Sequence, residues 1–197
     1  MEHYYQTVGE DWFTYPKLYS AVVKYFPDNS SFVEVGSWKG RSGTYMGVEI
    51  VNSGKEQSLV CVDIWVGSAE HQGMDILKED GLYLEFQKNI EPVNAQRPGT
   101  IEFIRGKSLD VVDSIQNFSL DFVFIDASHE YEDVIADIMS WYPKVKQGGV
   151  IAGHDYPHWP GVKKAVKEYF RRGDFVAKEQ CWIHQVGAKK DFYKFLR

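Results

Sequence analysis

The stretch that decides the fold is FVEVGSWKGRS, residues 32–42, in which an apolar run passes into a glycine loop. The run begins at Ser31 and ends at Val35, and its continuous apolar character predicts a buried strand. Gly36 and Gly40 follow at a spacing of G-x-x-x-G, and glycines after a strand allow the backbone to approach a ligand closely. The stretch therefore predicts a strand, a ligand-binding turn and the start of a helix.

Further apolar runs along the chain also predict strands. Most of them are continuous rather than alternating, which is typical of strands covered on both faces. Two late runs with a short connection predict a hairpin at one sheet edge. The expected strands are Ser31–Val35, Ser58–Asp63, Ile101–Ile104, Leu120–Asp126 and Gly149–Ala152, with the hairpin formed by Phe175–Ala177 and Cys181–Val186.

Apolar residues recur at helical spacing between these strands. The expected helices are marked by stripes over 15–26, 83–90, 109–115, 131–141 and 162–170. We expect Pro92 to end the second of them, because proline breaks the helical hydrogen-bond ladder. Alternating strands and helices predict a doubly wound α/β fold, a parallel sheet with helices on both faces.

The chain of 197 residues shows no linker or composition shift, so we expect one domain over residues 1–197. Within it we expect an N-terminal helical cap (1–28), a core (31–156) and the C-terminal hairpin (174–187). The stretch 65–81 is the longest segment without clear periodicity, and loops of that length are usually functional or mobile.

Composition narrows the class of protein. With 22 Lys+Arg against 28 Asp+Glu, the net charge of −6 argues against a protein built to hold nucleic-acid phosphate. No apolar run reaches the ~18–20 residues of a membrane helix, and no signal pattern is visible at the N-terminus. Cys61 and Cys181 have no metal-type spacing and fall in expected strands. We therefore expect reduced core thiols, a cytoplasmic location, and no nucleic-acid or membrane partner.

Polar residues follow every main strand. Ligands of open α/β sheets bind outside the carboxyl ends of the strands, so these residues predict a ligand cleft. Aromatic residues, 15% of the chain, also gather there, and we expect some of them to line its wall. The strand-end segments are Glu34–Gly40, Asp63–Trp65, Gly106–Ser108, Asp126–His129 and Gly153–Tyr156.

The glycine loop does not fit the common phosphate-binding motifs. Glu34 stands where a dinucleotide-binding loop has its first glycine, and a carboxylate there would repel a pyrophosphate. The same carboxylate can accept a hydrogen bond from an ammonium group. Asp63, at the end of the second strand, can accept bonds from both hydroxyls of a ribose.

With CVD at 61–63, FIDASHEY at 124–131 and GGVIAGHDY at 148–156, the sequence resembles the class I S-adenosylmethionine-dependent methyltransferases. It is most similar to the small-molecule O-methyltransferase branch that includes macrocin-type sugar methyltransferases and cephalosporin-hydroxylase-like proteins. The resemblance covers residues 32–156 and implies a seven-stranded, Rossmann-like sheet of order 3-2-1-4-5-7-6 with strand 7 antiparallel.

The resemblance also implies roles for particular residues around S-adenosylmethionine. The methionine part would lie at Glu34 and Gly36, with the neighbouring loop residues beside it, and Asp63 would hold the ribose. Ile64 or Trp65 would pack on the adenine. The full set of implied cofactor-binding residues is Glu34, Gly36, Ser37, Trp38, Gly40, Asp63, Ile64, Trp65, Gly106, Lys107, Ser108 and Asp126.

A second group of residues implies the chemistry. His129 matches the position of the catalytic base in the sugar-methylating relatives, and Asp126 is a second implied catalytic residue. Asp126, His154 and Asp155 match the positions that hold one Mg²⁺ in metal-dependent relatives, except that His154 replaces a carboxylate or amide. Oxygen ligands suit Mg²⁺, whereas an imidazole suits other divalent ions better, so the metal and its identity stay open.

The sequence thus predicts a methyltransferase acting on the oxygen of a small hydroxylated molecule such as a sugar. A cofactor-binding protein that does not methylate, and an α/β enzyme that binds a nucleotide phosphate, remain alternatives. A homodimer is a further expectation, because an edge hairpin and an aromatic N-terminus offer contact surfaces.

Overall fold

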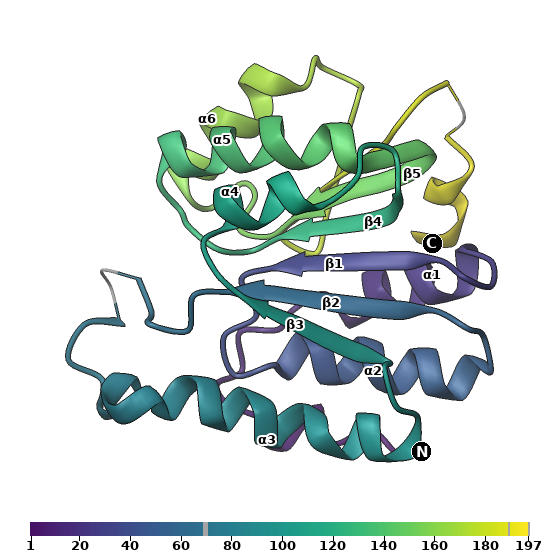
Figure 1. Cartoon of the computed structure of the whole chain (residues 1–197). Helices are drawn as coiled ribbons and strands as arrows, with labels where there is room; N and C mark the ends of the chain where they lie inside the picture. The colour runs from purple at the N-terminus through teal and green to yellow at the C-terminus, as the bar shows by residue number, and fades with distance from the viewer. Residues whose placement is uncertain (69–70, 189, 197) are drawn as a thin grey trace.

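A computed structural model describes residues 1–68, 71–188 and 190–196 of the chain, and it contains a seven-stranded sheet (Figure 1). The sheet order is β3-β2-β1-β4-β5-β7-β6, with β7 antiparallel to both of its neighbours, which confirms the predicted topology. The strands are β1 (Ser31–Val35), β2 (Ser58–Asp63), β3 (Ile101–Arg105), β4 (Leu120–Ile125), β5 (Val145–Gly153), β6 (Val176–Lys178) and β7 (Cys181–Gln185).

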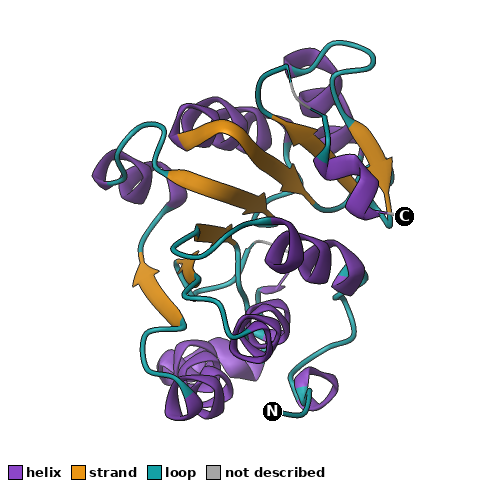
Figure 2. Ribbon diagram, turned by 90° about the vertical axis from the view of Figure 1, so that its right-hand side faces the viewer, coloured by secondary structure: helices purple, strands orange, loops and turns teal. Residues whose placement is uncertain are grey.

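Helices cover both faces of this sheet (Figures 1 and 2). Helices α1 to α3 lie on one face and α4 to α6 on the other, as Figure 1 shows. The longer elements are joined by short 3-10 helices: η1 (Tyr5–Thr7), η3 (Asp75–Asp80), η4 (Val112–Ser114), η5 (Tyr142–Lys144) and η6 (Phe192–Leu196). The α-helices are α1 (Pro16–Tyr25), α2 (Arg41–Ser53), α3 (Gly81–Gln96), α4 (Ser108–Val111), α5 (Tyr131–Trp141) and α6 (Pro160–Tyr169).

The core is split by the sheet into two layers because successive strand residues point to opposite faces. On β4, Phe122 and Phe124 belong to the layer under α1 to α3, whereas Val123 and Ile125 belong to the layer under α5 and α6. The side chains of all four are almost fully buried. This burial on both faces explains the continuous apolar runs in the sequence.

One predicted helix end is wrong. Helix α3 runs through Pro92 and ends at Gln96. The proline removes one N–H from the ladder, but Ile90 before it and Val93 after it are both buried against the core. Asn94 also exchanges two hydrogen bonds with the backbone of Ile101. These contacts on both sides of the proline hold the helix together.

The fifth strand begins earlier than predicted, at Val145 instead of Gly149. The two glycines at 148 and 149 interrupt its apolar pattern, and the pairing with β4 shifts register between Leu120 and Phe122. A Cβ on Gly149 would lie 2.9 Å from the carbonyl oxygen of Asp121, so the close backbone approach requires glycine there. The other predicted strands match the observed bounds or differ by one residue at one or both ends, as expected of strand ends.

The two cysteines are free thiols buried in β2 and β7, as predicted. No helix in the described part of the chain is both long enough and apolar enough to cross a membrane. The aperiodic stretch 65–81 contains η3, and its residues 69–70 lie outside the described residues.

Candidate active site

The glycine loop after β1 is held by the carboxylate at the end of β2. Oδ2 of Asp63 accepts hydrogen bonds from the backbone N–H groups of Ser37 (2.8 Å) and Trp38 (2.9 Å), and its Oδ1 accepts one from Trp65 (2.7 Å). Burial raises the pKa of Asp63, against the lowering effect of these N–H donors. A carboxylate has about four acceptor positions, so Asp63 can still accept a bond from a ligand hydroxyl.

Glycine is required at Gly36 and favoured at Gly40 by their surroundings. Gly36 has φ +87°, and a Cβ on it would lie 2.1 Å from the carbonyl oxygen of Asp126. The loop after β1 is therefore packed directly on the loop after β4. Gly40 has φ +83° at the start of α2, where a Cβ would lie 3.0 Å from the ring of Phe86.

The carboxylate of Glu34 is fully buried beneath the glycine loop. Its Oε2 accepts a 2.6 Å hydrogen bond from the hydroxyl of Tyr19. Burial raises the pKa of Glu34 to about 7, although the Tyr19 hydroxyl acts in the opposite direction. Within the described residues, Glu34 Oε1 and Ser37 Oγ are buried without a hydrogen-bond partner. Two such atoms, one near the end of β1 and one in the glycine loop that follows it, fit the binding of a polar group such as an ammonium.

Helix α1 supplies hydroxyls to two of the strand-end carboxylates. Tyr15 and Tyr19, one helical turn apart, donate to Asp126 (2.9 Å) and Glu34 (2.6 Å). The sequence alone did not reveal either of these hydrogen bonds. The available signal was the helical stripe itself: a buried tyrosine hydroxyl needs a partner, and the strand-end carboxylates are natural acceptors. Burial is the main reason that the pKa of each tyrosine lies well above its ordinary value.

Three of the predicted residues form a cluster at the ends of β4 and β5. Ligand atoms of Asp126, His154 and Asp155 all lie within 4.8 Å of one another. Nδ1 of His154 is 3.6 Å from Oδ1 of Asp126 and 3.4 Å from Oδ1 of Asp155. Burial disfavours the charged imidazole, but the hydrogen bond to Asp126 and both carboxylate charges outweigh it and raise the pKa of His154. Two carboxylates and one imidazole fit a divalent cation.

Thr14 joins this cluster from the segment before α1. Its hydroxyl oxygen lies 2.8 Å from Nε2 of His154 and also donates to the carbonyl oxygen of Glu179 (3.4 Å) in the β6–β7 turn. A hydroxyl can be donor or acceptor, so it can match either tautomer of the imidazole. Thr14 is the third contributor that the sequence did not reveal.

His129 is held between a carboxylate and an indole. Its Nε2 lies 2.8 Å from Oδ2 of Asp155, and its ring stacks on Trp159 with 3.9 Å between centroids and 14° between planes. Trp159 is 42% exposed, so the stacked pair lies at the protein surface. A carboxylate that orients an imidazole in this way is the usual arrangement for a general base.

Of the two residues predicted to pack on the adenine, Ile64 and Trp65, one is half-buried and the other is almost fully buried. Trp65 has a relative exposure of 1% and packs on Tyr83, Phe86 and Phe103, which leaves the half-buried Ile64 as the neighbour open to a ligand. The expected aromatic wall therefore does not include Trp65, because α3 encloses its ring.

The loop after β3 is held from two sides. The N–H of Gly106 donates to the carbonyl oxygen of Asp63 (2.9 Å), which joins the loop to β2. The hydroxyl of Ser108 donates to Asp137 (2.6 Å) and accepts from the indole N–H of Trp141 (2.7 Å), and therefore points toward α5. Lys107 is exposed.

The N-terminal segment lies against the glycine loop. The indole N–H of Trp38 donates to Glu10 (2.9 Å), and the ammonium of Lys39 pairs with the same carboxylate (2.7 Å). Arg41 pairs with Asp11 (2.6 Å). Trp38, which was predicted to lie beside the cofactor, and its neighbours Lys39 and Arg41 thus hold residues 10–11 against the glycine loop.

The chain belongs to a protein family: residues 33–156 match the family model described as "Methyltransferase domain". Protein R132 of Acanthamoeba polyphaga mimivirus, which is uncharacterized, is 28% identical over 149 residues, or 72% of this chain and 59% of that protein. The uncharacterized protein y4gI of Sinorhizobium fredii is 31% identical over 94 residues, or 48% of this chain and 10% of that protein. The chain thus spans less than two thirds of either relative.

Solved structures share the fold. The O-methyltransferase NovP has a TM-score of 0.67 at 19% identity, covering 88% of this chain and 78% of NovP. The O-methyltransferase TomG of Streptomyces achromogenes, solved with S-adenosylmethionine (SAM), has 0.59 at 14%, covering 87% and 79%. CalS11, a TDP-rhamnose 3'-O-methyltransferase, has 0.59 at 15%, covering 87% and 76%. The chain is a methyltransferase-family protein with the Rossmann-like methyltransferase fold.

Proposed function

We propose that the protein transfers a methyl group from S-adenosylmethionine to a hydroxyl of a small molecule such as a sugar. One observation carries the proposal: two strand-end carboxylates and an oriented imidazole lie at the carboxyl ends of the strands of one sheet. The carboxylates are Glu34 and Asp63, and the imidazole is His129 beside Asp155. The sugar methyltransferase among the structural relatives supports this class of acceptor as a hypothesis.

In this proposal the ends of β1 and β2 bind the methyl donor. Glu34 Oε1 and Ser37 Oγ, both without a partner in the described residues, receive the amino-acid end of the donor. Asp63 accepts a ribose hydroxyl with its remaining acceptor position, and Ile64 packs on the adenine, with the loop 106–108 at its edge. Since Glu34 has a pKa of about 7, binding of an ammonium favours its ionised form.

The ends of β4 and β5 act on the acceptor. As the acceptor oxygen bonds to the methyl carbon, the bond from that carbon to sulfur breaks and its electron pair stays on sulfur. His129 takes the hydroxyl proton, and Asp155 stabilises the imidazolium that forms, since its carboxylate is 2.8 Å from Nε2. The protein otherwise supplies alignment of the two reactants.

The same strand ends also offer a set of side chains that could bind a divalent cation during this reaction. Asp126, His154 and Asp155 would hold it, because their ligand atoms converge within 4.8 Å. When bound, such a cation polarises an acceptor oxygen and lowers the pKa of its hydroxyl. Tyr15 and Thr14 orient Asp126 and His154 from the other side.

The proposal is tested by incubating the protein with methyl-labelled S-adenosylmethionine and a panel of sugars, nucleotide sugars and phenols, with and without Mg²⁺ or Mn²⁺. We expect labelled O-methyl product together with S-adenosylhomocysteine. Binding of S-adenosylhomocysteine without any product over the panel would favour a cofactor-binding protein that does not methylate. Binding of a nucleotide phosphate in place of S-adenosylhomocysteine would overturn the proposal.

We further propose that the protein works in the cytoplasm on a small molecule, without a nucleic-acid partner, and that it forms a homodimer. Light scattering of the purified chain measures the oligomeric state directly, and a monomer at micromolar concentration contradicts the dimer.

A further inference from the structure

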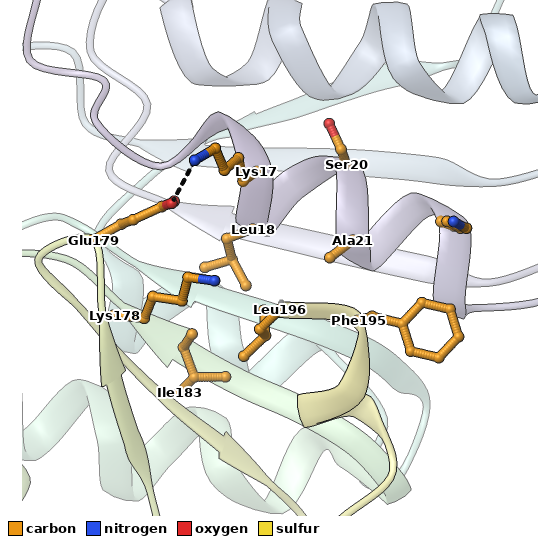
Figure 3. A pocket seen from close by; sticks show the side chains of 10 residues that line it. Lys17, Leu18, Ser20, Ala21, Lys178, Glu179, Ile183, Phe195 and Leu196 are labelled. Carbon is orange, nitrogen blue, oxygen red and sulfur yellow. Dashed lines mark ion pairs between the residues drawn. The ribbon is translucent and has the colours of Figure 1, made fainter.

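A cavity lies on the side of α1 that faces away from the strand-end carboxylates. It has a volume of about 240 Å³, is open to solvent on one side, and is lined by α1, the β6–β7 hairpin and η6 (Figure 3). Residues from three distant parts of the sequence meet there, among them Leu18, Ile183 and Leu196. None of the residues predicted to bind a cofactor or metal lines it.

The floor of this cavity is apolar. Leu18, Ala21 and Ile183 are 3%, 5% and 1% exposed, so each presents only a small patch of side chain to the cavity. In Figure 3 the side chains of Leu18, Ile183 and Leu196 point toward one another from α1, β7 and η6. An apolar body of a ligand is favoured on such a surface because it leaves water.

The rim of the cavity is positively charged. Lys17, Lys24 and Lys178 line it together with a single carboxylate, Glu179. That carboxylate is engaged by Lys17 at 3.6 Å. Within the described residues, the ammonium groups of Lys24 and Lys178 form no ion pair or hydrogen bond, and Lys178 reaches over the cavity toward Leu18 (Figure 3). A local positive excess on a chain of net charge −6 selects an anion.

We propose that this cavity binds a small amphiphilic carboxylate, with its anionic head on Lys178 and its apolar body against Leu18, Ile183 and Leu196. The size agrees with a small ligand, since cavities for drug-sized molecules begin at about 300 Å³. The ammonium of Lys178 would bind the head of the ligand and the apolar floor would bind its body, while Lys24 adds to the positive charge of the rim.

The site is separate from the candidate active site but shares its supports. Glu179 accepts a hydrogen bond from Thr14 through its backbone carbonyl (3.4 Å), and Thr14 contacts His154 (2.8 Å). Helix α1 carries Leu18 on the cavity side and Tyr19 on the side of Glu34. The ligand therefore does not compete with S-adenosylhomocysteine for space, and both can bind at once.

The experiment is a calorimetric titration of the full chain with octanoate, and in parallel with octanol. We expect octanoate to bind one site on the wild-type protein, and Lys178→Met to weaken it about tenfold or more, the effect of losing a charge-assisted hydrogen bond. Lys88→Met, an exposed lysine on α3, is the matched control and should leave the affinity unchanged. Octanol should bind wild type and Lys178→Met equally.

A second variant protects the test against loss of the fold. Ala21→Phe places a ring in the cavity and should abolish octanoate binding while S-adenosylhomocysteine still binds, which reports an intact protein. Octanoate that fails to bind wild type, or that binds Lys178→Met as tightly as wild type, overturns the proposal. A dimer that Lys178→Met dissociates, without any octanoate binding, also overturns it and assigns the cavity to a second copy of the chain.

Discussion

The carboxyl ends of β1 and β2 are built differently from those of β4 and β5, although both pairs belong to one sheet. At β1 and β2 the site is formed mainly by backbone groups: three N–H groups donate hydrogen bonds to Asp63, and Gly36 has no room for a Cβ. At β4 and β5 it is formed by side chains, those of Asp126, His154 and Asp155.

This difference separates a fixed region from a titrating one. Backbone bonds to a carboxylate preorganise the glycine loop for one ligand shape. Imidazoles next to carboxylates can instead gain and lose protons or accept a cation near neutral pH. These properties agree with the proposed donor binding at the first region and the proposed proton transfer at the second, and variants in each region should fail in different ways.

The largest effect is expected at the contact between the two regions. In Gly36→Ala the new Cβ would meet the carbonyl of Asp126 at 2.1 Å, and φ is +87°. We expect several kcal/mol of lost stability, roughly 3 or more, measured by urea unfolding. The control is Gly54→Ala, where φ is +70° but no atom lies within 4 Å; it should cost only about 1 kcal/mol. Equal losses in the two variants would contradict the packing of the loops.

His129→Gln tests the titrating region. Removal of a general base should lower kcat by about 10²–10⁴, while the affinity for S-adenosylhomocysteine stays within about twofold. A kcat equal to that of wild type would remove His129 from the mechanism.

Glu34→Gln tests the fixed region through pH. Burial raises the pKa of Glu34 from its ordinary value of 4.5 to about 7, so the folded protein binds this proton more tightly than the unfolded chain. The stability that the group contributes is therefore present below pH 4.5 and is lost as pH rises to about 7, by about 3 kcal/mol at most. Without ligand, Glu34→Gln should be more stable than wild type at pH 8, and this difference in stability should vanish near pH 5.

The same variant should bind S-adenosylhomocysteine more weakly, since the neutral amide replaces a carboxylate facing an ammonium. Thermal unfolding at pH 5 and pH 8, with and without the ligand, measures both effects. If Glu34→Gln is less stable than wild type at pH 8, the conclusion that burial raises the pKa of Glu34 is contradicted.

Ser108→Ala should give the smallest effect. Its hydroxyl bridges Asp137 and Trp141, so the variant should lose about 1–3 kcal/mol of stability by leaving two buried groups without this partner. Since the hydroxyl points to α5, the affinity for S-adenosylhomocysteine should change less than about twofold. A strong loss of affinity for S-adenosylhomocysteine without loss of stability would instead indicate that the Ser108 hydroxyl contacts the adenine.

The sequence predicted the fold well because strands covered on both faces leave continuous apolar runs, as at Leu120–Ile125. It failed at Pro92 and Val145, where tertiary contacts outweigh local signals. The proximity of residues 126, 154 and 155 was expected from the family resemblance and from their positions at the ends of two neighbouring strands, and the structure brings them together. Tyr15, Tyr19 and Thr14 were not, because they reach the site from the N-terminal segment, and spacing along the chain carries no information about that approach.

The donor site at the ends of β1 and β2 is tested most directly by a calorimetric titration of wild type, Asp63→Asn and His129→Gln with S-adenosylhomocysteine. We expect one site on wild type, at least about tenfold weaker binding to Asp63→Asn, and unchanged binding to His129→Gln. The absence of binding to wild type, or equal affinity for wild type and Asp63→Asn, would contradict the assignment of the donor to the ends of β1 and β2.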